Sequence, residues 1–223
     1  MKLLTQKYKF FIFDLDDTLF AENDYVISGI KYLEEFSNIF NSLSLKGVLQ
    51  DAYKKGKSDF LEVACKKLKL STKSKESLLW LYRLHKPKIE LACGVRETLD
   101  ILKSMEIKVV ILTDGRSITQ RLKVNALGLE DLPLYISEDY ESEKPDKKRF
   151  LQVEYDYPDM RYIYIADNPE KDFEAPYDME WICIGANWIR DRIHAVNIKK
   201  MPDICLSSPL DIISSLIELD KFY

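Results

Sequence analysis

The sequence is poor in cysteine, and its cysteines form no recognisable motif. The 223 residues include four cysteines, which lie far apart with no CxxC pair and no histidine beside them. Because zinc sites use closely spaced cysteines and histidines, this spacing argues against a zinc centre. Cys65, Cys183 and Cys205 stand in apolar stretches, which predicts buried free thiols and fits the reducing cytoplasm.

Long apolar runs, a basic excess and histidines are also missing. No stretch approaches the roughly 18 apolar residues of a membrane span, and charges interrupt the N-terminal segment before it reaches signal-peptide length. The formal net charge of −4 argues against non-specific nucleic-acid binding, which needs a basic face. The two histidines, His85 and His194, stand in unrelated contexts, which argues against a histidine-based mechanism. We therefore expect a globular, cytoplasmic protein with no membrane or nucleic-acid partner.

Short apolar runs alternate with segments of helical periodicity through most of the chain. This alternation is typical of a parallel sheet with helices on both faces. Strands are predicted at residues 9–13, 108–112, 134–136, 162–166, 181–184 and 204–206. Helices are predicted at residues 95–103, 117–127 and 147–153, and again from Ser208 onward.

Residues 22–91 interrupt this alternation directly after the first predicted strand. Their apolar residues recur at helical spacing, and the pattern predicts about four helices and no strand. The predicted fold class is therefore α/β: a doubly wound, Rossmann-like parallel sheet that carries an inserted all-helical domain. We expect a core made of residues 1–20 and 92–223 and a helical insertion at residues 21–91.

Polar residues follow three of the predicted strands and precede one predicted helix. They are Asp14, Asp16 and Asp17, then Thr113, Asp114, Gly115 and Arg116, then Lys144, and finally Asp167 and Asp172. Ligands of such folds bind at the carboxyl ends of the strands, so these residues are predicted to converge on one edge of the sheet. Taken singly, each could be an ordinary turn residue or a solvated helix start.

Each residue type in this set has a defined chemical use. Clustered carboxylates repel one another unless a cation compensates them, and an oxygen-only ligand set suits magnesium. One carboxylate can attack phosphorus, and a second can protonate the leaving oxygen and later activate water. Threonine and lysine can hold the phosphoryl oxygens during transfer. The combination predicts magnesium-dependent phosphoryl transfer.

The ordered motifs DLDDTLF, ILTDG, SEKPDKKRF and IADNPEKDF resemble those of the haloacid dehalogenase superfamily, in its phosphatase branch. The resemblance implies that Asp14 is the nucleophile. It implies that Asp16 is the general acid and base, and that the backbone carbonyl of Asp16 is a metal ligand. The helical insertion resembles the small cap of that family, which closes over the site and selects the leaving group.

The resemblance also assigns the phosphate and metal ligands. Thr113 is similar to the phosphate-binding hydroxyl, and Lys144 to the residue that screens the charge of nucleophile and phosphoryl group. Asp14 and Asp167 are implied as side-chain ligands of Mg²⁺, and Asp172 as a supporting carboxylate of the metal site that works through water. Asp114, Gly115 and Arg116 join Thr113 and Lys144 as candidate substrate-binding residues, although Arg116 could instead be a solvated helix start.

Rival functions differ in the residues that they require. A dehalogenase of the same superfamily needs no acid at the position of Asp16, so this carboxyl favours phosphoryl chemistry. A phosphomutase keeps the same acid and stays an alternative, as does a non-catalytic binding or regulatory module with the same fold. The expected partner is a small phosphorylated metabolite, such as a sugar phosphate or a nucleotide, and the sequence predicts no oligomeric state.

Overall fold

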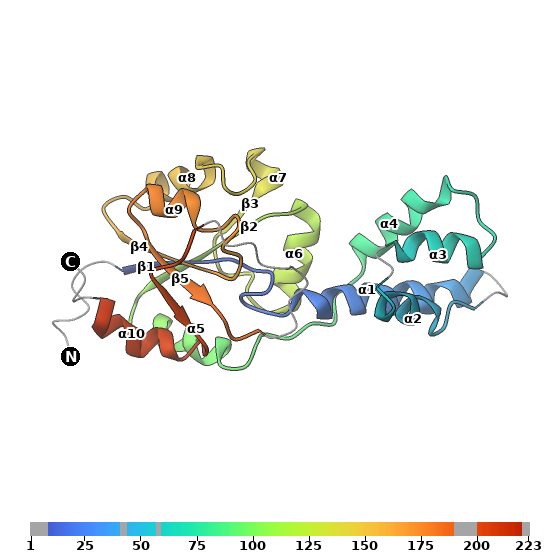
Figure 1. The fold of residues 1–223 in the computed structure, drawn as a ribbon, viewed down its shortest axis with the longest axis horizontal. Helices are drawn as coiled ribbons and strands as arrows, with labels where there is room; N and C mark the ends of the chain where they lie inside the picture. Colours follow the sequence, from blue (N-terminus) through green and yellow to red (C-terminus); the bar gives the residue numbers. More distant parts are fainter. Residues whose placement is uncertain (1–8, 41–43, 57–58, 190–199, 220–223) are drawn as a thin grey trace. The chain divides into compact units, whose positions relative to one another are not determined.

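The computed structural model describes residues 9–40, 44–56, 59–189 and 200–219 (Figure 1). The chain divides into two compact units. The core unit consists of Met1–Glu22 and Glu90–Tyr223, and the cap unit is Asn23–Ile89.

Six parallel strands form the sheet of the core unit within the described residues. The strands are β1 (Lys9–Phe13), β2 (Lys108–Thr113), β3 (Leu134–Ile136), β4 (Arg161–Ala166), β5 (Ile182–Ala186) and β6 (Ile204–Leu206). Their order is β3-β2-β1-β4-β5-β6, with every pair parallel. The doubly wound fold class predicted from the sequence is confirmed.

Helices cover both faces of this sheet. They are α5 (Val95–Ser104), α6 (Ser117–Ala126), α7 (Ser137–Tyr140), α8 (Lys148–Asp156), α9 (Glu174–Asp178) and α10 (Asp211–Leu219). Figure 1 shows α7, α8 and α9 on one side of the sheet, with α5 and α10 on the other. The sequence did not predict α7 or α9, because one helical turn is too short to show a period of 3.6 residues.

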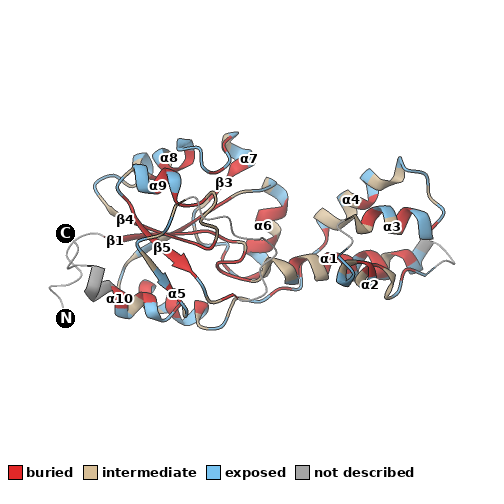
Figure 2. Cartoon of the chain, viewed as in Figure 1, coloured by how far each residue is buried: buried red, intermediate tan, exposed pale blue. Residues whose placement is uncertain are grey.

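The strand β1 lies at the centre of the sheet and is buried along its whole length (Figure 2). Its run KFFIF is apolar on both faces after Lys9, as expected for a parallel strand that is covered by helices on both sides. Phe10 and Ile12 share a core cluster with Leu112 of β2 and Phe150 of α8. This packing fixes the end of β1, and with it the position of Asp14.

The predicted burial of the cysteines is correct for two of them. Cys65 and Cys183 are buried free thiols, whereas Cys205 is exposed, contrary to the prediction. Cys205 lies on β6, which is an edge strand of the described sheet and pairs with β5 along one side only. The apolar sequence around Cys205 therefore does not guarantee burial.

The described residues of the cap unit are helical and contain no strand. The helices are α1 (Glu22–Phe40), which begins one residue before this unit, α2 (Val48–Lys54), α3 (Phe60–Lys67) and α4 (Ser74–Leu84). Ile30 and Leu33 of α1 pack with Leu49, Leu61 and Leu78 in one apolar cluster. None of the described helices has the length and apolar composition needed to cross a bilayer.

Glu34 of α1 caps the start of α2. The N-cap residue of α2 is Gly47, which has no side chain with which to bind the first N–H groups of the helix. The buried Glu34 carboxylate accepts hydrogen bonds from the backbone N–H groups of Gly47 (2.9 Å), Leu49 (2.8 Å) and Gln50 (3.1 Å). It thus joins α2 to α1 from within the cap unit.

Replacement of this capping carboxylate is expected to destabilise the cap unit. Glu34→Ala leaves three backbone N–H donors and the Gln50 side-chain amide without their acceptor, and bonds to a charged group contribute roughly 1.5–3 kcal/mol each. We expect a loss of about 2–3 kcal/mol, since water will replace part of the contacts. Urea unfolding and hydrogen exchange at the Leu49 and Gln50 amides measure it. Glu35→Ala, at the adjacent exposed position, is the control, and an equal effect of both changes would contradict the capping role.

Candidate active site

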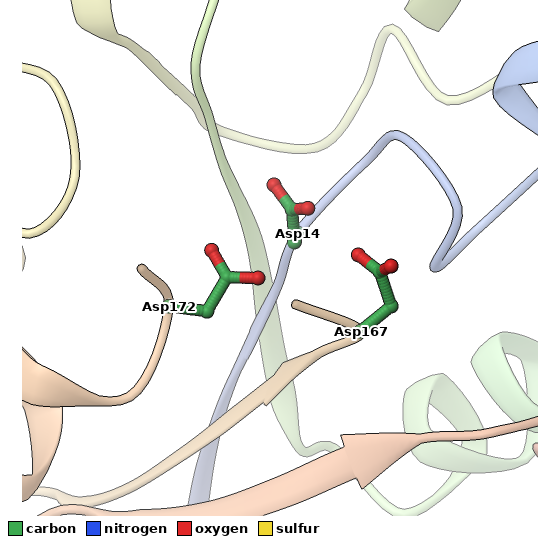
Figure 3. Close-up of side chains that lie close together, drawn as sticks. All are labelled: Asp14, Asp167 and Asp172. Atoms are coloured by element: carbon green, nitrogen blue, oxygen red, sulfur yellow. The ribbon is translucent and has the colours of Figure 1, made fainter. Parts of the chain in front are cut away.

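Three carboxylates meet where β1 and β4 end. Phe13, the last residue of β1, pairs with Ile165 of β4, and the N–H of Asp14 donates to the Ile165 carbonyl at 2.9 Å. Asp167 directly follows β4, so the parallel register brings it beside Asp14. Carboxylate oxygens of Asp14, Asp167 and Asp172 lie within 4.8 Å of one another, and all three residues are buried (Figure 3).

Lys144 is the ammonium that faces this cluster. Its Nζ donates to Asp14 Oδ1 at 2.7 Å and to Asp172 Oδ1 at 2.8 Å, and its side chain is 1% exposed. Burial alone would lower the pKa of Lys144, but the two carboxylates raise it well above its ordinary value. Burial raises the pKa of Asp14. The neighbouring Lys144 ammonium lowers it, but by less than burial raises it. Ionised Asp14 is therefore an energetic cost to the metal-free protein.

The donor set of this cluster fits a divalent cation. The three buried carboxylates lie close together, and such a cluster repels itself unless cations compensate it. Their oxygens are the ligand type that Mg²⁺ prefers. Asp172 is also held in place, since its Oδ2 accepts the N–H of Asn168 at 2.9 Å. Asp14, Asp167 and Asp172 are thus the side chains that would hold a metal ion.

Thr113 and Asp114 lie at the end of β2, next to β1. The Thr113 hydroxyl is buried and accepts a hydrogen bond from Gln120 Nε2 at 2.8 Å. The carboxylate of Asp114 pairs with the fully buried Arg149 and accepts the backbone N–H of Lys144 at 3.2 Å. The carboxylate of Asp114 thus joins the Thr113 and Lys144 segments to each other, and its substrate-binding role stays a prediction.

Arg149 completes this junction from α8. Its Nη1 donates to the Thr113 carbonyl at 2.7 Å, while Nη2 pairs with Asp114. Burial would raise the pKa of Asp114, but the cations Lys144, Arg149 and Lys171 together hold it below its ordinary value. One partly buried ion pair, between Arg149 and Asp114, therefore helps to position Thr113 and Lys144, the residues predicted to hold the phosphoryl group.

Gly115 and Arg116 line a cavity of about 600 Å³ together with residues from α7 and the segment before Lys144. Gly115 has φ of +140°, and a Cβ there would come 3.0 Å from Gln120 Cδ, so this position requires glycine. The Arg116 guanidinium pairs with Glu138 at 2.7 Å on an exposed surface. The substrate-binding roles of both residues stay predictions.

Asp16 is not part of the carboxylate cluster. Lys123 Nζ lies 2.7 and 3.0 Å from its two carboxylate oxygens, and Gln120 Nε2 lies 2.9 Å from Oδ2. Sequence reasoning missed these two residues and Arg149. The available signal was weak: Gln120 and Lys123 are polar residues one turn apart on a helix that starts just after the Thr113 motif.

These features define a class of protein: an α/β fold with an acidic cluster at the carboxyl ends of neighbouring parallel strands and a helical unit inserted after the first strand. A model of the haloacid dehalogenase-like hydrolases matches residues 11–185 of the chain. The chain therefore belongs to the haloacid dehalogenase-like hydrolase family, as its motifs predicted.

Solved structures of this kind match nearly the whole chain. YfnB of Bacillus subtilis, named a HAD-hydrolase and solved with magnesium, is 20% identical with a TM-score of 0.66 over 95% of this chain and 99% of that chain. A predicted phosphoglycolate phosphatase of Haemophilus somnus 129PT is 16% identical, with a TM-score of 0.66 over 93% of this chain and 97% of that chain. A 2-haloacid dehalogenase of Pseudomonas syringae pv. tomato DC3000 is 17% identical, with a TM-score of 0.63 over 95% of this chain and 99% of that chain. No curated protein matches the chain. The likeness shows the fold and does not select one reaction.

Proposed function

We propose that the protein is a magnesium-dependent phosphatase that hydrolyses a small-molecule phosphate monoester. The observation that carries this proposal is the buried group of Asp14, Asp167, Asp172 and Lys144, in which Lys144 Nζ lies 2.7 Å from Asp14 Oδ1. Asp16 supports it, because a carboxyl group two residues after the nucleophile serves proton transfer in phosphoryl chemistry. The substrate class proposed is a sugar phosphate, a nucleotide or a similar phosphorylated metabolite.

The reaction proceeds in two steps on this chain. A carboxylate oxygen of Asp14 attacks phosphorus, the ester P–O bond breaks, and Asp16 protonates the departing oxygen. Asp16 then removes a proton from water, which attacks the phosphorus of the aspartyl-phosphate and releases inorganic phosphate and free Asp14. Lys144 and the Thr113 hydroxyl hold the phosphoryl oxygens through both steps. Bound magnesium supplies charge neutralisation at the carboxylates and the phosphoryl group.

The proposal is tested by phosphate release in the presence and absence of metal. The purified protein is expected to hydrolyse p-nitrophenyl phosphate with MgCl₂, to stop when EDTA is added, and to recover when Mg²⁺ is returned in excess. A panel of sugar phosphates and nucleoside monophosphates then identifies the substrate class. Absence of phosphate release across the whole panel, or activity that EDTA leaves unchanged, would show the proposal to be wrong. Conversion of a sugar phosphate to its isomer without phosphate release would instead indicate a phosphomutase.

A further inference from the structure

The Asp16 carboxylate is bound entirely by two side chains of α6 in the described part of the chain. Lys123 Nζ contacts both carboxylate oxygens, at 2.7 and 3.0 Å, and Gln120 Nε2 contacts Oδ2 at 2.9 Å. The Lys123 ammonium is buried and also lies 5.8 Å from the centre of the Phe20 ring. Asp16 itself stands on the loop after β1, with a side chain that is 21% exposed.

A buried lysine in this position is not explained by stability alone. Removal of an ammonium from water is costly unless a carboxylate and further hydrogen bonds compensate it, and an apolar side chain often serves a protein core as well. The compensating partner of Lys123 is Asp16, the residue proposed to transfer protons.

Gln120 connects the same carboxylate to the phosphate-binding hydroxyl. Its Nε2 lies 2.8 Å from Thr113 Oγ1 and 2.8 Å from the Asp114 carbonyl, in addition to its contact with Asp16. An amide nitrogen only donates hydrogen bonds, so the Thr113 oxygen is the acceptor, and the Thr113 hydroxyl in turn donates to the Asp114 carbonyl at 3.4 Å. The glycine at position 115 is what allows Gln120 to approach this closely.

We propose that Lys123 is a positioning residue for Asp16, and that Gln120 holds Asp16 and Thr113 in one arrangement, so that α6 sets both the proton-transfer group and a phosphate ligand. This inference rests on the proposed phosphatase function. Without Lys123 the carboxylate keeps one side-chain partner on a partly exposed loop and rotates into water. The step that then suffers is the transfer of a proton to the leaving oxygen.

Substrates with different leaving groups distinguish a role of Lys123 in proton transfer from a purely structural role. The ratio kcat/KM reports the steps up to cleavage of the ester bond. An alkyl phosphate such as glycerol 2-phosphate has a poor leaving group that depends on proton donation, whereas p-nitrophenyl phosphate does not. General acids contribute about 10²–10⁴-fold, so Lys123→Met is expected to lower kcat/KM for the alkyl phosphate by about 10- to 100-fold. For p-nitrophenyl phosphate we expect a loss of less than about threefold.

The chain offers a matched control on the same helix. Arg121→Met also removes a long cation from α6, but Arg121 is exposed and pairs with Asp139 at 2.8 Å. We expect this variant to hydrolyse both substrates with the kcat/KM values of the wild type. Circular dichroism and thermal melting verify folding, and Lys123→Gln, which keeps a hydrogen-bond donor, replaces Lys123→Met where that variant does not fold.

A second measurement asks whether Lys123 acts through Asp16. In an Asp16→Asn background, Lys123→Met is expected to cause no further loss of kcat/KM with glycerol 2-phosphate, the substrate on which the single variant loses about 10- to 100-fold. An equal loss for both substrates in the single variant, no loss for the alkyl phosphate, or a full further loss in the Asp16→Asn background would overturn the proposal. Failure of the underlying function is distinct, because the wild type would then hydrolyse neither substrate.

Discussion

Asp14→Asn is expected to abolish phosphate release and, at the same time, to make the metal-free protein more stable. An amide oxygen is a poor nucleophile, so kcat should fall by at least about a thousandfold. The stability gain follows from burial, which raises the pKa of Asp14 and makes its ionised form costly in the folded state. Each kcal/mol gained shifts the melting temperature of a chain of this size by about 2–4 °C.

The sign of this effect depends on pH. A carboxyl group whose folded pKa is raised costs stability above that pKa and costs nothing below the ordinary carboxyl range, where it is protonated in both states. The advantage of Asp14→Asn over the wild type should therefore be largest at mildly alkaline pH and vanish as the pH falls below about 4. Excess Mg²⁺ should reverse this difference in stability. The wild type then gains stability by binding the metal through the Asp14 carboxylate, which the variant lacks.

Thermal melting with EDTA and with MgCl₂, together with phosphate-release assays, measures both consequences. Asp100→Asn on α5 is the control, since Asp100 is an exposed carboxylate of the core unit. It should change neither activity nor the response of the melting temperature to Mg²⁺. Retained activity in Asp14→Asn would remove the nucleophile from the mechanism, and a lower melting temperature without metal would contradict the electrostatic account.

The arrangement of Asp14 and Asp167 could be predicted from sequence because it depends on local patterns. Each residue directly follows a continuous apolar run, and such runs form buried parallel strands whose carboxyl ends meet at one edge. Residues 22–91 could likewise be identified as helical, because long amphipathic segments carry a clear period. The parallel sheet was predicted, but its strand order, β3-β2-β1-β4-β5-β6, was not.

The partners of the site residues could not be predicted, because they depend on packing between elements. Lys123 and Asp16 are 107 positions apart, and Arg149 and Asp114 are 35 apart. In the sequence, Arg149 closes the basic run KPDKKR and looks like a solvated residue, whereas in the structure it is fully buried. The helical period of α8 predicts which of its faces is buried, but it does not predict which carboxylate pairs with Arg149.

Asp114→Asn is expected to destabilise the core unit strongly. The substitution keeps a carbonyl oxygen for the Lys144 N–H but removes the charge that compensates Arg149, whose side chain is fully buried. Breaking a buried ion pair by removing one partner costs about 3–5 kcal/mol, because the remaining charge is left without compensation. Urea unfolding at neutral pH measures the loss of unfolding free energy.

Lys171→Met is the matched control for this change. Lys171 also faces Asp114, at 3.5 Å, but its side chain is 41% exposed, and such surface pairs contribute about 0–1 kcal/mol. A loss in Asp114→Asn that is no larger than the loss in Lys171→Met would show that the Arg149 pair does not stabilise the fold.

The double variant Asp114→Asn/Arg149→Met separates folding from positioning. It removes the guanidinium that Asp114→Asn leaves without compensation, so about 2 kcal/mol or more of the single-variant loss should return. Arg149 Nη1 also holds the Thr113 carbonyl at 2.7 Å, and that contact does not return. We therefore expect a stable protein whose kcat/KM for p-nitrophenyl phosphate stays well below that of the wild type. Full recovery of both stability and activity would mean that the ion pair serves only the fold, and that Thr113 and Lys144 are positioned by the sheet and loop backbone alone.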